Sequence, residues 1–131
     1  MNTPTALKKE IMSGKTIAGA MVFEFFSPGM SAILSNAGSR FVIYDMEHTG
    51  LDYETLKWLF ATCRGLPITP MVRVPTREYT WIARALDIGA EGVMVPMVET
   101  RQQAEQLAES CRYPGIGRRG AAFGFAQCDY K

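Results

Sequence analysis

The stretch FVIYDMEHTGLDYETLKWLFATCRG, residues 41–65, predicts a complete strand–loop–helix unit. Its first five residues are almost continuously apolar, as expected of a strand that is covered on both faces of a parallel sheet. Asp52 is placed to cap a following helix, and Gly65 is placed to end it. The apolar positions of that helix have the spacing of one buried face, at Leu56, Leu59, Phe60 and Cys63.

The same unit recurs on both sides of this stretch. Three further short apolar runs predict strands at residues 16–23, 68–74 and 92–98. Helices are expected to begin at Ser27-Pro28, at Thr76 and at the capping box of Thr100 with Gln103, and to end at Gly38, at Gly89 and before Pro114; another helix is expected over residues 4–13. Strands that alternate with helices in this way are parallel. The pattern predicts an α/β fold, either an open doubly wound sheet or part of a (βα)8 barrel.

Length, charge and cysteine content exclude several classes of protein. At 131 residues the chain is expected to form one domain, residues 1–131. Its 14 Lys and Arg balance 13 Asp and Glu, so we expect no nucleic-acid partner and no attraction to an anionic membrane. No apolar run reaches the roughly 18 residues of a membrane helix. Three widely spaced cysteines favour neither a disulfide framework nor a cysteine metal site, and we expect a cytoplasmic protein.

Polar residues gather where two predicted strands end. Asp45, Glu47 and His48 follow one strand, and Arg73 lies at the end of the next. Because the carboxyl ends of parallel strands share one edge of the sheet, these four side chains are expected to meet there. Taken alone, each could be a helix cap or half of an ion pair. Together, a neutral imidazole that takes a proton and a guanidinium that stabilises the resulting anion predict proton abstraction next to a carbonyl.

Two other features do not fit this pattern. Asp87 lies in the last turn of a predicted helix, where the helix dipole disfavours a negative charge. Residues 115–120 read GIGRRG and match GxGxxG, but they follow a helix and Pro114 rather than a strand, so a nicotinamide site is rejected. We expect a loop there instead, with Arg118 and Arg119 as candidates for contacting an anion.

Four motifs, in order, resemble those of one family. They are DMEH at 45–48, VRVP at 72–75, LDIGAEGVMVPMVET at 86–100 and YPGIGRRG at 113–120. The chain is similar to the class II pyruvate aldolases of the 4-hydroxy-2-oxoheptane-1,7-dioate aldolase and citrate lyase superfamily. The resemblance implies a (βα)8 barrel that cleaves 4-hydroxy-2-oxo acids to pyruvate and an aldehyde, using a divalent metal such as Mg, Mn or Co. Such a barrel has about 250 residues, so residues 1–131 would be a single partial domain, its N-terminal half.

The resemblance also implies roles for individual residues. His48 would be the catalytic acid/base, Arg73 would stabilise the pyruvate enolate, and Asp87 would raise the basicity of the histidine. Asp45 and Glu47 would lie just behind the metal or bind substrate. The family's metal ligands lie on later strands, so we expect no metal ligand within this chain. A small 2-oxo acid is the expected substrate, and a homo-oligomer is the expected assembly.

Three alternatives stay open at this point. The chain could be a non-catalytic half-barrel fragment or assembly module, or it could belong to an acyl-CoA or citrate-type lyase of the same superfamily. An open flavodoxin-like binding module needs a first loop that cradles phosphate, but residues 24–29, EFFSPG, contain one glycine and an acidic residue. The leading prediction is the N-terminal half of a metal-dependent aldolase that is inactive without its other half.

Overall fold

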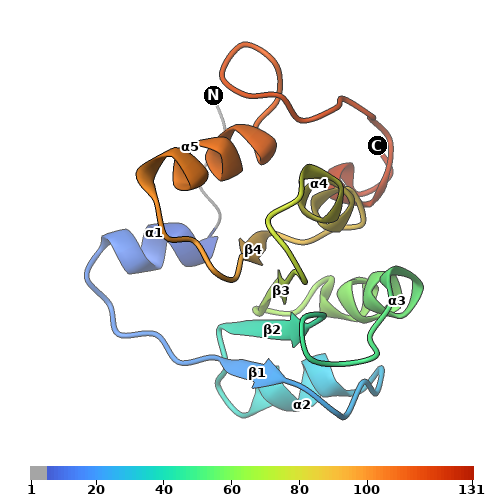
Figure 1. The fold of residues 1–131 in the computed structure, drawn as a ribbon. Helices are drawn as coiled ribbons and strands as arrows, with labels where there is room; N and C mark the ends of the chain where they lie inside the picture. Colours follow the sequence, from blue (N-terminus) through green and yellow to red (C-terminus); the bar gives the residue numbers. More distant parts are fainter. Residues whose placement is uncertain (1–5) are drawn as a thin grey trace.

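The computed structural model describes residues 6–131 as four parallel strands that alternate with helices (Figure 1). The strands are β1 (Ala20–Val22), β2 (Phe41–Asp45), β3 (Thr69–Arg73) and β4 (Gly92–Met94). The helices are α1 (Ala6–Met12), α2 (Met30–Asn36), α3 (Tyr53–Cys63), α4 (Tyr79–Asp87) and α5 (Arg101–Ser110), followed by a short 3-10 helix, η1 (Ala126–Cys128). The predicted α/β fold is confirmed.

The order of the strands decides between the two architectures left open by the sequence. They lie in the sheet as β1-β2-β3-β4, and each is parallel to its neighbours (Figure 1). A doubly wound sheet reverses its strand order at a switch point, whereas a (βα)8 barrel adds each strand beside the previous one. The sequential order is that of four consecutive barrel units, and the flavodoxin-like alternative is wrong.

The pairing register divides the sheet into two faces. Val42, Tyr44 and Val72 are fully buried and form one core cluster with the four predicted inward positions of α3. Side chains alternate along a strand, so the residues next to them point to the opposite face. On that face, Asp45 at the end of β2 lies directly opposite Arg73 at the end of β3.

The two outer strands are shorter than predicted: residues 16–19 and 23 do not pair as strand at β1, and residues 95–98 do not at β4. Within residues 6–131, β1 pairs with β2 alone and β4 pairs with β3 alone, so each has a partner on one side. Beyond β4, Pro96 has no N–H to donate to a ladder, and Met97 adopts a φ of 56°, which turns the backbone out of the strand.

The predicted caps at Asp52 and Thr100 are confirmed, whereas the helices expected to begin at Ser27-Pro28 and at Thr76 begin later, at Met30 and Tyr79. The Asp52 carboxylate accepts a hydrogen bond from the backbone amide of Thr55 at 2.8 Å, and Thr100 forms the full capping box with Gln103. The hydroxyls of Ser27 and Thr76 instead accept hydrogen bonds from the backbone amides of Gly29 and Glu78, at 3.3 and 3.2 Å. Each helix begins at the residue that follows this amide. The geometry at Ser27 and Thr76 is that of a side-chain turn that precedes a helix.

Helix α1 lies at the amino ends of the strands, opposite the candidate site. Glu10 of α1 pairs at 2.6 Å with Arg40, which directly precedes β2, and Arg40 also donates to the carbonyl of Pro67 before β3. The helix predicted over residues 4–13 is confirmed from residue 6 to residue 12; residues 4 and 5 lie outside the described residues.

Helix α5 buries less than its sequence pattern predicts. Ala104 is exposed, Leu107 and Cys111 are half-buried, and Ser110 is fully buried in their place. The reason is position: α5 packs on α4 beside the edge strand β4. Among residues 6–131 no helix is both long enough and apolar enough to cross a membrane.

Candidate active site

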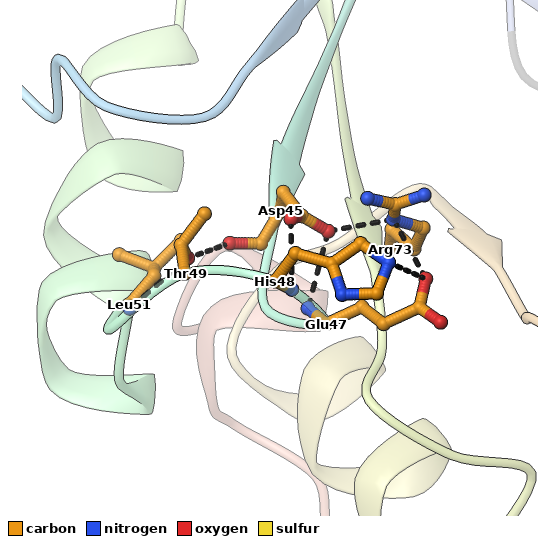
Figure 2. Close-up of polar contacts among 6 residues, drawn as sticks. All are labelled: Asp45, Glu47, His48, Thr49, Leu51 and Arg73. Atoms are coloured by element: carbon orange, nitrogen blue, oxygen red, sulfur yellow. Dashed lines mark hydrogen bonds and ion pairs between the residues drawn. The ribbon is translucent and has the colours of Figure 1, made fainter.

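The carboxylate of Asp45 shapes the loop after β2. Its Oδ1 accepts the backbone N–H of Glu47 at 3.1 Å, and its Oδ2 accepts that of His48 at 3.0 Å (Figure 2). The Thr49 hydroxyl donates to the Asp45 carbonyl and accepts the amide of Leu51 at 3.2 Å. An aspartate that bonds amides two and three residues ahead forces a tight turn. The turn holds Glu47 and His48 at the carboxyl end of the strand.

Arg73 joins the two strand ends through both acidic residues. Its Nε donates to Asp45 Oδ1 at 2.6 Å and lies 3.1 Å from Glu47 Oε2 (Figure 2). The Asp45 side chain is fully buried, so its charge needs such a partner. Burial by itself would raise the pKa of Asp45, but hydrogen bonds from Arg73 and from two backbone amides outweigh it and hold that pKa below its usual range. The same bond to Asp45 raises the pKa of Arg73.

His48 completes the group, which we call the rim cluster: Asp45, Glu47, His48 and Arg73. Its Nε2 lies 3.7 Å from Glu47 Oε2, and its side chain is 66% exposed. The structure thus brings together four of the five predicted site residues at one edge of the sheet (Figure 2). An accessible imidazole beside a buried ion pair can exchange protons with a bound molecule.

The outer part of the Arg73 guanidinium is available for binding. Within residues 6–131 its two Nη groups form no hydrogen bond, and its central carbon lies 5.6 Å from the centroid of the Phe23 ring. A guanidinium with free Nη groups offers a planar pair of donors to an oxyanion. Sequence reasoning missed Phe23, although that residue ends the strand predicted at 16–23 and so falls at the same edge.

Asp87 does not join the rim cluster. It ends α4, and its Oδ1 accepts from Arg119 Nη2 at 2.6 Å and from Arg119 Nε at 3.2 Å. Arg119 is buried and stacks on the Tyr113 ring, 4.8 Å from the centroid. This pair explains how a carboxylate is tolerated at a helix C-terminus, because the guanidinium compensates the unfavourable dipole. Arg119 therefore acts within the chain rather than as an anion contact.

The rim cluster does not supply a metal-binding set. Among the described residues no three His, Cys, Asp or Glu side chains come together as ligands. The carboxylates of Asp45 and Glu47 both face Arg73, whose positive charge opposes a cation at the same place. Residues 6–131 by themselves do not fit a resident divalent metal.

The chain is similar to known proteins of one family. The HpcH/HpaI aldolase/citrate lyase family model matches residues 20–126. A hydroxypyruvate/pyruvate aldolase of Roseobacter denitrificans is 36% identical over 129 residues, covering 93% of this chain and 50% of the relative. A 5-keto-4-deoxy-D-glucarate aldolase of Escherichia coli is 38% identical over 96 residues, covering 73% of this chain and 38% of the relative.

A solved structure agrees with these matches. The HpcH/HpaI aldolase of Desulfitobacterium hafniense superposes with a TM-score of 0.90 at 30% identity, covering 95% of this chain and 48% of that one. The chain spans about half the length of these relatives or less. The resemblance carried by the four sequence motifs is confirmed, and the chain belongs to the HpcH/HpaI aldolase/citrate lyase family.

Proposed function

We propose that the rim cluster is the acid/base and anion-binding part of an aldolase site that cleaves 4-hydroxy-2-oxo acids to pyruvate and an aldehyde. One observation carries the proposal: Arg73 is clamped through Nε while its Nη groups stay free, with the exposed imidazole of His48 at the same edge. Two of the similar proteins are named as a hydroxypyruvate/pyruvate aldolase and a 5-keto-4-deoxy-D-glucarate aldolase, which supports a small oxo acid as substrate.

In this proposal the neutral imidazole of His48 accepts the proton of the substrate's 4-hydroxyl. The C3–C4 bond then breaks: C4 leaves as the aldehyde, and the electron pair of the bond becomes the enolate of pyruvate. The free Nη groups of Arg73 donate to the enolate oxygens and stabilise the charge that forms there. The protonated His48 returns its proton to C3, which gives pyruvate and restores the imidazole.

The acidic residues have positioning roles in this proposal. Asp45 fixes the loop that carries His48 and, together with Glu47, fixes the orientation of Arg73. The role predicted for Asp87, raising the basicity of His48, has no contact to support it among the described residues, since Asp87 pairs with Arg119. That role stays a prediction.

The wider predictions also stay proposals. We propose that residues 1–131 are one partial domain, that the complete catalytic unit takes a divalent metal such as Mg, Mn or Co through residues other than 6–131, and that the protein is a cytoplasmic homo-oligomer. All three cysteines are free thiols, which is compatible with a reducing compartment.

The direct test joins residues 1–131 to the second half of a related barrel. Residues 1–131 would replace the matching half of the Roseobacter denitrificans aldolase, and exchange of the pyruvate methyl protons with deuterium would be followed by NMR in the presence of Mg²⁺, Mn²⁺ or Co²⁺. We expect exchange in the chimera. His48→Ala should lower its rate at least about 100-fold, the usual contribution of a general acid/base. Arg73→Ala should lower it as well.

Lys57→Ala, on the exposed side of α3, is the control and should leave exchange unchanged. Wild-type exchange and cleavage rates in the His48→Ala chimera would overturn the assignment. Asp87→Asn in the same chimera tests the separate prediction for that residue: a role in basicity shifts the pH profile of exchange, whereas a role limited to the Arg119 pair changes stability alone.

A non-catalytic assembly module is the second candidate, and the open sheet favours it. Both outer strands, β1 and β4, have a single neighbour among the described residues. Unpaired strand edges and uncovered apolar faces promote association. If the chimera shows no exchange while the chain itself forms a defined oligomer, the assembly role replaces the catalytic one.

A further inference from the structure

A polar cavity lies outside the rim cluster. It has a volume of about 230 Å³ and is lined by Arg77, Gln103, Gln106, Leu107, Ser110 and Arg118. Three segments meet there: the loop after β3, one face of α5, and the GIGRRG segment that follows α5. None of these residues belongs to the rim cluster.

The cavity is positively charged without a compensating acid. Its lining contains two arginines and no carboxylate. Arg77 has one hydrogen bond, from Nη1 to the Met97 carbonyl at 3.4 Å, and Arg118 donates from Nε and Nη2 to the hydroxyl of Ser110 at 3.4 and 3.2 Å. Neither forms an ion pair with the described residues, whereas Arg73 and Arg119 each face a carboxylate.

Two polar groups between the arginines, the side-chain amide of Gln103 and the hydroxyl of Ser110, already have hydrogen-bond partners. The Oε1 of Gln103 already accepts the amides of Glu99 and Thr100, at 2.8 and 3.2 Å, so its NH₂ group is the part left to bind. The hydroxyl of Ser110 is almost fully buried and donates to the Gln106 carbonyl at 2.8 Å while accepting from Arg118. The cavity therefore presents two guanidinium groups and the NH₂ group of Gln103 to a ligand, because the hydroxyl hydrogen of Ser110 is already donated to Gln106.

The loop that carries Arg118 is held in place before any ligand arrives. The Arg118 amide donates to the Glu109 carbonyl at 2.9 Å, and the Gly120 amide donates to the Tyr79 hydroxyl at 2.7 Å. The guanidinium of Arg118 also lies over the Tyr79 ring, 5.5 Å from its centroid. A preformed arrangement of this kind costs little ordering entropy on binding.

We propose that this cavity binds a phosphate-sized oxyanion between Arg77 and Arg118. Guanidinium groups match the oxygens of phosphate in paired hydrogen bonds. The volume is smaller than the roughly 300–1,000 Å³ of pockets for larger organic ligands, which points to a small ion or to the phosphate group of a monoester. Of the two arginines that the GIGRRG motif singled out, the structure uses Arg119 for Asp87 and leaves Arg118 for the anion.

The test uses the 131-residue chain and isothermal titration calorimetry at constant ionic strength, held with sodium chloride. Inorganic phosphate is the first titrant and glycerol 1-phosphate the second. We expect saturable binding of at least one of them. Tighter binding of inorganic phosphate would identify the ligand as free phosphate, and tighter binding of glycerol 1-phosphate would identify it as a phosphate monoester. Arg77→Gln and Arg118→Gln should each weaken binding at least about tenfold, the effect of losing a charged hydrogen-bond donor.

Arg101→Gln is the matched control, because it removes an equal charge from the exposed face of α5, where Arg101 pairs with Glu105. It should bind like the wild type. Absence of saturable binding of both titrants, wild-type affinity in Arg77→Gln, or an equal loss in Arg101→Gln would each overturn the proposal. Arg77 lies in an exposed loop, so its variant decides the matter if Arg118→Gln does not fold.

Discussion

Asp45 shows how one buried residue can set the geometry of a whole site. It ends β2, turns the following loop through two backbone amides, and holds the Nε of Arg73. Its side chain is completely removed from solvent, so these three contacts take the place of water around the charge. The positions of His48 and Arg73 both depend on this one carboxylate.

Removing Arg73 should destabilise the fold as well as the site. Arg73→Ala leaves the buried Asp45 charge unpaired, and we expect the free energy of unfolding to fall by about 3 kcal/mol in urea denaturation. Arg101→Ala breaks the exposed pair with Glu105 and should cost no more than about 0.5 kcal/mol. Equal losses in the two variants would show that the Asp45–Arg73 pair does not stabilise the fold.

The lowered pKa of Asp45 predicts a specific loss of stability in acid. The unfolded chain has the higher pKa, about 3.9, so it binds the proton more readily, and stability falls as pH drops below about 4 and through the folded pKa. Asp45→Asn should show a shallower fall in unfolding free energy over that window, while Glu105→Gln should follow the wild type. If Asp45→Asn does not fold, an NMR titration of the Asp45 carboxyl checks the same shift directly: an ordinary or raised pKa contradicts it.

At the scale of single elements, the sequence predicted a helix cap correctly where the capping side chain and the amide that it accepts from lie within one helical turn. The caps at Asp52 and Thr100 connect residues three positions apart, and the sequence shows both members. The hydroxyls of Ser27 and Thr76 are also local, but they can bond either of two nearby amides, and spacing does not choose between them.

The capping box of α5 gives a prediction at this scale. Thr100→Ala removes the acceptor for the Gln103 amide and should cost about 1 kcal/mol of unfolding free energy. The amides of α5 should also exchange with deuterium faster, because the first turn of the helix loses its cap. Gln102→Ala, exposed in the same turn, is the control. Unchanged exchange across α5 in Thr100→Ala would contradict the prediction.

A buried polar network between elements had no signal in the sequence. The Ser31 hydroxyl of α2 lies 2.8 Å from the Tyr44 hydroxyl of β2 and 2.9 Å from the Thr62 hydroxyl of α3, and it accepts from the Cys63 thiol at 3.1 Å. Burial raises the pKa of Tyr44 to about 12. The partners are up to 32 residues apart, so only the packing of α2 and α3 on the same face of the sheet brings them together.

At the scale of the whole molecule, the sheet formed by the described residues, 6–131, has an unpaired edge strand at each side. β4 and the residues that follow it leave Met94, Met97 and Val98 exposed, by 39, 72 and 40%. A strand edge with exposed apolar side chains is a surface for pairing with another chain. The proposed role as an assembly module depends on this edge.

Self-association through β4 can be tested by size-exclusion chromatography with light scattering. We expect the wild-type chain to form oligomers whose mass grows with concentration, and Met94→Lys to shift it toward the monomer, because a charged side chain on an edge strand opposes pairing. Ile33→Lys, on an exposed position of α2, should leave the mass unchanged. A wild-type chain that stays monomeric at every concentration contradicts the prediction.

The sequence by itself determined the βα alternation, the two caps at Asp52 and Thr100, the family, and the edge at which His48 and Arg73 meet. Each depends on spacing along the chain or on the rule that parallel strands end on one side of a sheet. Only the tertiary structure decided that Asp87 pairs with Arg119 and that Arg118 lines a separate cavity. The physical reason is distance along the chain: side chains that are far apart in sequence choose their partners through the packing of whole elements, which no local pattern records.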